Sequence, residues 1–371
     1  MTTFPMDLVR PDLQAFTGYS SARTSFAGPP ARIWLNANEA AEANAVDPHG
    51  RSRRYPQPQP AALRDAYAAY LGAEAEQLLL ARGSDEAIDV LVRALCRPGS
   101  TDGIVVCSPT FGMYAVSAEL HGVPVHDVPQ RDAGARFVHD LTAVARRVRD
   151  SGARIVFIAT PGNPSGSTVE IEDALRLAKE LSDVAMVVLD EAYVEFAEQR
   201  SVIADLDQHP TLAVLRTMSK AHGLAGARIG ALVAHPDLVS VLRRVQAPYP
   251  LPAPVTELAV RALDKAVLQD TTVRIESTVC RRNRLAAIVA RHPGVSTVYR
   301  SEGNFVLARC LDVDQVIRDV ATHSIAIRDM RHLPGLHDAV RVSVGTDADL
   351  DALADALAQH ENHEPTSERT R

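Results

Sequence analysis

The sequence predicts an α/β protein with a mostly parallel sheet that contains one antiparallel strand and is sandwiched by helices, with a smaller α+β unit beside it. Three observations support this prediction. Short apolar runs alternate with segments of helical period from residue 61 to residue 189. These runs do not alternate apolar with polar residues, which is typical of parallel strands covered on both faces. After Pro248–Pro254 the pattern changes to long helices with little strand.

The N-terminal part is expected to be irregular until residue 60. Residues 1–30 contain Pro, Gly and Ser without a clear period and are interpreted as an arm. A short strand is expected at Arg32–Asn36, and the proline-rich segment Ala43–Gln59 is expected to be extended. The helices that follow are expected at Ala61–Leu71, Ser84–Cys96 with Ser84 as its N-cap, Gly112–His121, Val138–Val148 and Glu170–Leu181. The strands among them are expected at Gly103–Cys107, Val123–Val128, Ala153–Ala159, Val184–Leu189 and Leu212–Leu215.

One connection between two expected strands is too short for the alternation of strands and helices. About a dozen residues separate the strand that ends near Arg216 from the one that begins near Arg228, which leaves little room for a crossover helix. We therefore expect Ile229–Ala234 to run antiparallel to its neighbours. The smaller unit is expected to contain helices within Val255–His292, further elements at Asn304–Ala308, Gln315–Ala321, Ile325–Arg328 and Val340–Val344, and a helix at Ala348–His360.

These elements predict a large domain at residues 31–250. The second part consists of the arm, residues 1–30, and a small C-terminal domain, residues 251–371, whose tail from about 361 is expected to be disordered.

The net charge of −7 and pI near 6.0 argue against a nucleic-acid surface. No apolar stretch approaches the roughly 20 residues of a membrane span, and no signal peptide is recognised. The four scattered cysteines fit reduced thiols in a cytoplasmic protein, and no histidine spacing predicts a metal site.

Lys220 is the first candidate for a reactive residue. It follows a strand-length apolar run and is close to Gly223, Gly226 and Gly230, which allow a backbone to approach a ligand closely. A lysine at the carboxyl edge of a strand is placed to attack a carbonyl group, although a lone lysine is more often a solvated surface residue.

A phosphate site is the second candidate. Residues 82–86, Arg-Gly-Ser-Asp-Glu, open a helix after the apolar run Leu78–Leu80. A glycine followed by a helix N-terminus offers free N–H groups and a positive dipole to an anion. A plain capping motif explains the same residues equally well.

Three further polar residues lie where a ligand would bind. Asn163 is in a Pro-Gly turn after a strand, at the edge where open α/β sheets bind ligands. Asp190 ends a buried strand and needs a partner, either a magnesium ion or a protonated heteroaromatic nitrogen. Arg341 lies within an apolar strand, where it forms either a structural ion pair or a grip for a carboxylate or phosphate.

Together these motifs resemble the fold type I pyridoxal-phosphate enzymes, and specifically the histidinol-phosphate aminotransferases. The resemblance covers nearly the whole chain. Its motifs, in order, are YSSAR from Tyr19, LNANE from Leu35, RYP from Arg54, GSDE, SPTFGMY, PGNPSG, DEAYVEF, TMSKAHGLAGARIG, APYPLP, IRD and VRVSVGT. The combination is specific, and LNANE, RYP and APYPLP point most to this family.

The resemblance implies roles for individual residues. Lys220 is similar to the Schiff-base lysine that also moves the substrate proton, and Asp190 to the partner of the pyridine nitrogen. Tyr193 and Asn163 are similar to the hydrogen-bond donors to the ring hydroxyl oxygen. The implied phosphate cup consists of Ser84, Asp85, Ser219 and Arg228, with Thr217 assisting, and Phe111 stacks on the ring.

The resemblance also implies a homodimer with shared sites, because Tyr55 is similar to a residue that reaches the cofactor phosphate of the other subunit. Arg341 is similar to the arginine that holds the α-carboxylate of the amino donor. Tyr19 and Arg328 are candidates for the phosphate end of the second substrate, and Asn38, in the LNANE motif, is also expected to bind substrate.

Three positions depart from the family pattern. Phe111 stands where a tyrosine usually stacks, Gly162 replaces a commoner asparagine, and His222 stands where another aromatic side chain is usual. We expect the stacking face to survive, the glycine to be neutral and the histidine to be a packing substitution.

The expected activity is a ping-pong transamination in histidine biosynthesis between histidinol phosphate and 2-oxoglutarate, with pyridoxal 5'-phosphate as cofactor. Three other interpretations share the fold: an aminotransferase of aromatic amino acids, a threonine-phosphate decarboxylase, and a non-catalytic effector domain. The last is disfavoured because only about 30 residues precede the first expected strand and the full set of cofactor residues is intact.

Overall fold

A seven-stranded sheet forms the centre of the computed structural model, which describes residues 3–21 and 31–358. Four neighbouring pairs of strands are parallel, whereas β9 is antiparallel to both β1 and β8. The antiparallel strand expected at Ile229–Ala234 is therefore confirmed. In spatial order the strands are β1 (Leu78–Ala81), β9 (Gly230–Val233), β8 (Leu212–Thr217), β7 (Met186–Asp190), β6 (Ile155–Ala159), β2 (Ile104–Val106) and β3 (Val125–Asp127).

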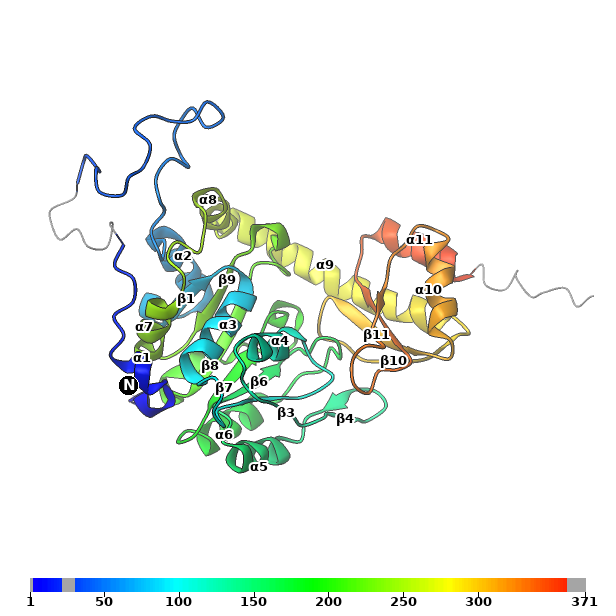
Figure 1. Cartoon of the computed structure of the whole chain (residues 1–371). Coiled ribbons are helices and arrows are strands. Elements are labelled where there is room, and N and C mark those ends of the chain that lie inside the picture. The colour runs from blue at the N-terminus through cyan, green and yellow to red at the C-terminus, as the bar shows by residue number, and fades with distance from the viewer. Residues whose placement is uncertain (1–2, 22–30, 359–371) are drawn as a thin grey trace, which may run out of the picture.

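Helices cover both faces of this sheet (Figure 1). One face packs against α2 (Ala61–Leu71), α5 (Leu141–Ser151), α6 (Ile171–Glu180) and α8 (Ala253–Ala262). The other packs against α3 (Gly83–Leu95), α4 (Met113–Leu120) and α7 (Pro236–Val245).

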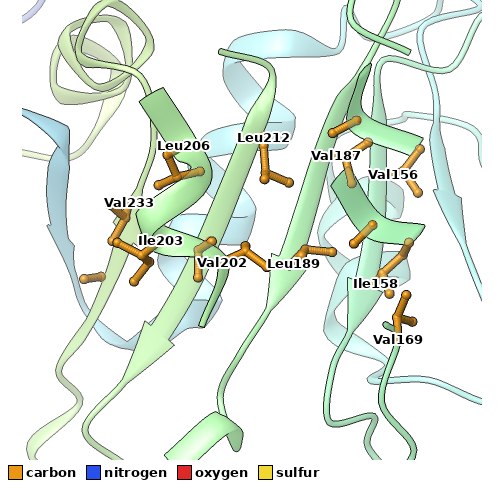
Figure 2. Packing of buried hydrophobic residues seen from close by; sticks show 14 of the residues in the cluster. Val156, Ile158, Val169, Val187, Leu189, Val202, Ile203, Leu206, Leu212 and Val233 are labelled. Carbon is orange, nitrogen blue, oxygen red and sulfur yellow. The ribbon is translucent and has the colours of Figure 1, made fainter. Parts of the chain in front are cut away.

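Successive strand residues point to opposite faces, so each strand contributes to two cores. Val187 and Leu189 of β7 belong to the first core, and Figure 2 shows them beside Val202 and Leu212. Met186 and Val188 belong to the second core. Both faces are apolar because both are buried, which explains the apolar strands without alternation.

The smaller unit contains a four-stranded antiparallel sheet in the order β10 (Val295–Val298), β11 (Phe305–Cys310), β13 (Ala339–Ser343), β12 (Arg328–Asp329). It packs against α10 (Val313–Ala321), α11 (Asp347–Ala358) and the last turns of α9 (Lys265–Ala290). Helix α9 crosses from the large sheet to this unit (Figure 1).

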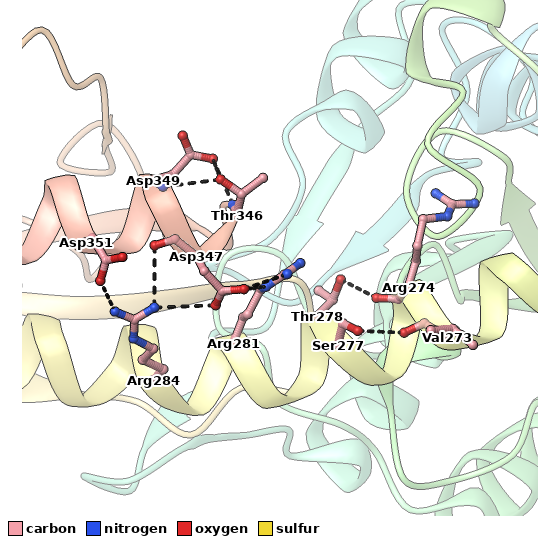
Figure 3. Close-up of polar contacts among 10 residues, drawn as sticks. All are labelled: Val273, Arg274, Ser277, Thr278, Arg281, Arg284, Thr346, Asp347, Asp349 and Asp351. Atoms are coloured by element: carbon pink, nitrogen blue, oxygen red, sulfur yellow. Dashed lines mark hydrogen bonds and ion pairs between the residues drawn. The ribbon is translucent and has the colours of Figure 1, made fainter.

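Ion pairs join α9 to the start of α11 on the surface of the smaller unit. Arg281 Nη2 lies 2.7 Å from Asp347 Oδ2, and Arg284 pairs with Asp347 and Asp351 (Figure 3). These side chains are partly exposed, so the pairs add little to the apolar contacts beneath them.

Several sequence expectations were wrong in detail. Arg32–Asn36 forms no strand, because no neighbouring strand pairs with it and Leu35 is 92% exposed. Ser84 is not an N-cap; α3 begins one residue earlier after Arg82, whose backbone N–H donates to Glu86. The helix expected from Val138 begins at Leu141, where Asp140 caps it by accepting from Ala143 N–H.

The strand expected at Ile325–Arg328 is reduced to Arg328–Asp329, because only these residues pair with β13. The sequence analysis did not identify α7, β10 or the hairpin of β4 (Arg131–Asp132) and β5 (Phe137–Val138). The remaining elements are short: η1 (Met6–Leu8), α1 (Pro11–Gln14), η2 (Ala75–Gln77), η3 (Val194–Phe196), η4 (Val202–Gln208) and η5 (Ala225–Ala227).

Some expectations cannot be compared with the structure. Residues 22–30 of the arm, including Arg23 of the YSSAR motif, and the tail from 359 lie outside the described residues. Within the described ranges, no helix is both long and apolar enough to cross a membrane.

Candidate active site

The candidate site is a cavity of about 610 Å³ at the carboxyl ends of the parallel strands. Asp190 ends β7, Thr217 ends β8, Asn163 follows β6, and Ser84 lies in the first turn of α3 after β1. Twelve of the fifteen predicted site residues line this cavity. They are Ser84, Asp85, Phe111, Asn163, Asp190, Tyr193, Thr217, Ser219, Lys220, Arg228, Arg328 and Arg341.

Lys220 lies in the loop after β8 and lines the cavity. Its Nζ lies 5.3 Å from the centre of the Tyr193 ring. Desolvation by the cavity walls lowers the pKa of Lys220, and the Arg341 guanidinium lowers it further, whereas Asp190 and Asp85 oppose the shift. The lowered pKa increases the fraction of neutral amine, which is the form that attacks a carbonyl or accepts a proton.

The N-terminus of α3 and Arg228 form a cradle for an anion. The first N–H groups of a helix have no partner within the helix. Arg228 adopts a left-handed backbone conformation with φ of 55° and donates to Ser219 Oγ at 3.3 Å and to Asp85 Oδ2 at 3.1 Å. A Cβ on Gly83 would lie 2.6 Å from Arg228 Nη2, so the glycine allows the guanidinium to lie against the helix start. Thr217 Oγ1 donates to Ser219 Oγ at 3.0 Å.

Asp190 is a buried carboxylate with neutral hydrogen-bond donors. Its Oδ2 accepts from the Tyr114 hydroxyl at 2.7 Å and its Oδ1 from Ala192 N–H at 3.1 Å. Burial raises the pKa of Asp190, and both hydrogen bonds oppose that rise. The negative charge is therefore stabilised in part, and a cation at the cavity floor would stabilise it further.

Tyr193, Asn163 and Arg341 form the wall beside Lys220. Arg341 Nη1 donates to Asn163 Oδ1, and its guanidinium carbon lies 5.4 Å from the centre of the Phe305 ring. The Tyr193 ring meets Phe305 edge-on with centroids 5.2 Å apart. Burial raises the pKa of Tyr193 to about 12, so its hydroxyl stays protonated and can donate. Arg341 has no carboxylate partner in the described chain and is left able to bind one from a ligand.

The rest of the cavity wall is mainly apolar. Phe111 is half-buried and meets Tyr114 edge-on at 5.7 Å. Met330, His332 and Leu333, between β12 and β13, complete the wall next to Arg328. No pattern in the sequence marks these three residues, because only the fold brings their loop to the cavity. Tyr114 was not predicted either, although it is in the SPTFGMY motif three residues after Phe111.

Three predicted site residues lie elsewhere in the chain. Tyr55 and Asn38 line a separate cavity of about 470 Å³. Tyr55 is half-exposed and stacks on Tyr249 with ring centres 4.8 Å apart. Tyr19 lines a third cavity of about 540 Å³ and is 68% exposed. A single chain therefore does not bring these residues to Lys220.

The main cavity fits pyridoxal 5'-phosphate. The helix start with Arg228 suits its phosphate, and the Asp190 carboxylate, which has only neutral donors, suits a protonated ring nitrogen. Lys220 suits its aldehyde. Among the described residues, no cluster of histidine, cysteine or acidic side chains suits a metal ion.

The cavity and the fold around it define an aminotransferase that uses pyridoxal phosphate. The family model described as "Aminotransferase class I and II" matches residues 27–357, so the chain belongs to that class. A histidinol-phosphate aminotransferase of Stenotrophomonas maltophilia is 50% identical over 95% of this chain and 96% of its own length. One of Xanthomonas euvesicatoria is 47% identical over 92% of this chain and 93% of its own length. Within the class, the chain therefore belongs to the histidinol-phosphate aminotransferase family.

Solved structures agree with this fold. The histidinol-phosphate aminotransferase of Sinorhizobium meliloti, in complex with pyridoxal-5'-phosphate, has a TM-score of 0.74 and 28% identity, covering 87% of this chain and 89% of that chain. The histidinol-phosphate aminotransferase of Clostridium acetobutylicum has a TM-score of 0.75 at 20% identity, covering 85% of this chain and 93% of that chain, and it supports the fold alone.

Proposed function

We propose that this chain transfers an amino group between L-histidinol phosphate and 2-oxoglutarate, giving imidazole-acetol phosphate and L-glutamate, in histidine biosynthesis. The observation that carries the proposal is one cavity that holds Lys220, an anion cradle, the buried Asp190 and two arginines. Relatives that are 45–50% identical over more than nine-tenths of the chain carry the same activity in their names.

Pyridoxal phosphate, when bound, supplies an aldehyde that takes up the amino group and a ring that withdraws electrons from the reacting carbon. Lys220 Nζ moves the proton of the substrate carbon, since its lowered pKa keeps part of the amine neutral. With the cofactor bound, Asp190 would hold a proton on the ring nitrogen. Tyr193 and Asn163 would orient the ring hydroxyl oxygen, and Phe111 would supply an apolar face.

Two arginines allow one cavity to accept two different substrates. Glutamate carries an α-carboxylate, whereas histidinol phosphate carries a phosphate arm. Arg341 is half-buried in the cavity wall and binds the carboxylate as a planar fork. Arg328 is exposed at the cavity wall next to His332 and binds the phosphate arm.

The active unit that we propose is a homodimer with shared sites. Tyr55, Asn38 and Tyr19 lie away from the Lys220 cavity of their own chain, which supports a role for them in a second subunit's site. Residues 31–60 contain no helix or strand, extend from the body of the chain (Figure 1), and expose Leu35 at 92% and Val46 at 91%. Such exposed apolar side chains favour burial against another chain. We place this dimer in the cytoplasm, where its buried cysteines would remain free thiols.

The test is a comparison of amino donors. Purified enzyme with bound cofactor is mixed separately with histidinol phosphate, phenylalanine and threonine phosphate, and the visible band of the cofactor is followed as it converts to the amino form. We expect conversion to be fastest with histidinol phosphate. Conversion no faster than with phenylalanine would show that the substrate is wrong, and release of carbon dioxide from threonine phosphate would indicate the decarboxylase instead.

A further inference from the structure

Tyr114 is a fully buried tyrosine that contacts the site from behind. It lies in the first turn of α4, three residues after Phe111, and its relative exposure is 0%. The described cavity wall includes Phe111, Gly112 and Met113 but not Tyr114. Its side chain therefore lies behind the cavity wall.

Two aromatic neighbours fix the Tyr114 ring. It lies parallel to Phe157 of β6, with centroids 4.8 Å apart and an interplanar angle of 2°, and Phe111 meets it edge-on at 85°. The backbone at this point is a helix packed on the sheet, so the phenol has little freedom to turn. Packing of the ring therefore sets the direction in which the hydroxyl points.

That hydroxyl points at Asp190. Its oxygen lies 2.7 Å from Asp190 Oδ2, while Ala192 N–H holds Oδ1 at 3.1 Å. Each carboxylate oxygen has two acceptor positions, so these two donors fix the plane of the carboxylate and leave acceptor positions for a ligand. A hydrogen bond from a hydroxyl to a carboxylate is among the stronger kinds in proteins.

We infer that Tyr114 is a positioning residue of the proposed reaction, whose hydroxyl keeps the Asp190 carboxylate ionised and turned toward the ring nitrogen of the cofactor. Without this donor, a carboxylate at the end of a buried strand would favour its neutral form, because burial opposes its charge. The proton shared by Asp190 and the ring nitrogen would then reside on the carboxylate, and the ring would lose its positive charge. The inference rests on the proposed cofactor chemistry but not on the identity of the substrate.

A purely structural role predicts something different. Tyr114 could simply use Asp190 to satisfy its own buried hydroxyl, since buried phenols usually have a partner. In that case, removing the hydroxyl would change stability but leave the charge of the cofactor ring unaltered. The two roles are therefore distinguished by the protonation state of the ring nitrogen.

The experiment compares two variants that each lose a phenol–carboxylate hydrogen bond. Tyr114→Phe keeps the ring between Phe157 and Phe111 and removes the bond to Asp190. Tyr299→Phe is the control, because the Tyr299 hydroxyl donates to Asp132 Oδ2 at 2.5 Å and also accepts from Arg309 Nε at 2.6 Å, so this variant loses at least as many hydrogen bonds. Tyr299 is 2% exposed and lies outside the cavity wall. Each variant is loaded with pyridoxal phosphate labelled with ¹⁵N in the ring, and the nitrogen chemical shift is measured against pH without substrate.

In Tyr114→Phe we expect the nitrogen signal to move toward that of unprotonated pyridine, with its titration midpoint lower by about one pH unit. We also expect kcat to fall about tenfold with little change in KM, which is the same free-energy difference expressed as a rate. Tyr299→Phe should retain the nitrogen signal of the unmodified enzyme, even if its melting temperature falls.

An unchanged nitrogen signal in Tyr114→Phe at every pH would overturn the inference and assign the residue a structural role. The same signal change in Tyr299→Phe would also overturn it, because the effect would then follow from any lost hydrogen bond. The spectra are recorded without substrate. Failure of the enzyme to convert histidinol phosphate would therefore refute the proposed function and leave this result standing.

Discussion

Lys220 takes its reactivity from its neighbours. A lysine in water is protonated at neutral pH, whereas this one lies in a cavity whose walls and Arg341 guanidinium both lower its pKa. Asp190 and Asp85 limit the shift by favouring the charged form. The surroundings thus prepare one amine of the chain for attack on a carbonyl.

Replacing Lys220 with alanine should therefore abolish turnover. We expect kcat in Lys220→Ala to fall by at least about 10⁴-fold, because the group that transfers the proton is removed. Steady-state assays with histidinol phosphate and 2-oxoglutarate would measure this. Lys179→Ala, on the exposed surface of α6, is the matched control and should be as active as the unmodified enzyme. Normal activity in Lys220→Ala would contradict the assigned mechanism.

The pH dependence of Lys220 itself provides a second test. In cofactor-free protein, we expect the acetylation rate of Lys220 to reach half its maximum at a lower pH than that of the lysine in a short unstructured peptide added to the same sample, since a lowered pKa leaves the amine neutral in more acidic solution. Arg341→Gln removes a positive neighbour and should move the Lys220 midpoint upward. Mass spectrometry of acetylated peptides measures both lysines in one sample. Equal midpoints for Lys220 and the lysine of the added peptide would show that the cavity does not perturb the amine.

His222 is expected to affect the stability of the protein rather than catalysis. It is 5% exposed, neither ring nitrogen has a partner among the described residues, and its ring meets Tyr70 edge-on at 5.1 Å. We expect His222→Phe to raise the free energy of unfolding by about 1 kcal/mol, because a buried polar group without a partner costs about that much. Thermal melts measure the gain. His337→Phe, at an exposed site, is the control and should give none.

The gain from His222→Phe should also depend on pH. Burial lowers the pKa of His222, so below about pH 6.5 the unfolded chain takes up a proton that the folded chain does not. The stability of the unmodified protein is therefore lost as the pH falls through that range, and the advantage of phenylalanine should grow. A constant difference between pH 5 and pH 8 would show that the imidazole has hidden partners.

Sequence motifs were sufficient to select most residues of the main cavity but not the residues that support them. Lys220, Asp190 and Arg228 occur in local patterns whose spacing indicates their chemistry. Tyr114 acts through Asp190, 76 positions away in the chain, and only the packing of α4 on β6 and β7 brings the two together. His332 has no local pattern and depends on the position of a loop in the smaller unit.

At the scale of elements, the anion cradle depends on the contact between α3 and β9. A Cβ on Gly230 would lie 2.5 Å from both Gly83 C and Ser84 N, so the first turn of α3 rests directly on the backbone of β9. Because β9 is antiparallel, the loop after β8 returns to place Arg228 beside that turn. The one reversed strand therefore positions half of the cradle.

Gly230→Ala should disrupt the cradle. We expect the added methyl group to push the start of α3 away, with a loss of about 1–3 kcal/mol in the free energy of unfolding and weaker cofactor binding. Gly226→Ala, in η5 four residues earlier, is the control, since a Cβ there meets nothing within 4 Å. Thermal melts and cofactor titrations of both variants measure the effects. Equal cofactor affinity in the two variants would show that this close contact does not matter.

The element predictions succeeded where burial decided the structure. Strands β6, β7 and β8 are buried on both faces, so their apolar runs were sufficient. Arg32–Asn36 has a similar apolar pattern but meets no partner strand, and a sequence cannot show the absence of a partner. The hairpin of β4 and β5 has strands of only two residues each, which are too short to show a period.

At the scale of the whole molecule, the main cavity uses both units of the chain. The large sheet supplies Lys220 and Asp190, and the smaller unit supplies Arg328 and Arg341. Helix α9 links them: its Arg282 donates to the Phe196 and Gly303 carbonyl oxygens. In the described chain, no residue before 60 lines this cavity. If Tyr55 contacts the cofactor, it must therefore do so in another subunit or after a rearrangement of its own chain, and a test of Tyr55 distinguishes the two.

Mixing two inactive variants tests the shared site directly. The Lys220→Ala variant retains Tyr55, and the Tyr55→Ala variant retains Lys220. At limiting cofactor, each variant alone should have little activity. If Tyr55 serves the other subunit, a mixed dimer contains one complete site, because the chain with Lys220 receives Tyr55 from the chain without it. Random exchange makes about half of the dimers mixed, so we expect about a quarter of the unmodified activity to return.

Lys220→Ala mixed with a Lys220→Ala/Tyr55→Ala double variant is the control and should remain inactive. If Tyr55 instead serves its own chain, every site in the mixture lacks one residue and no activity returns, so the assay separates the two arrangements by a single measurement.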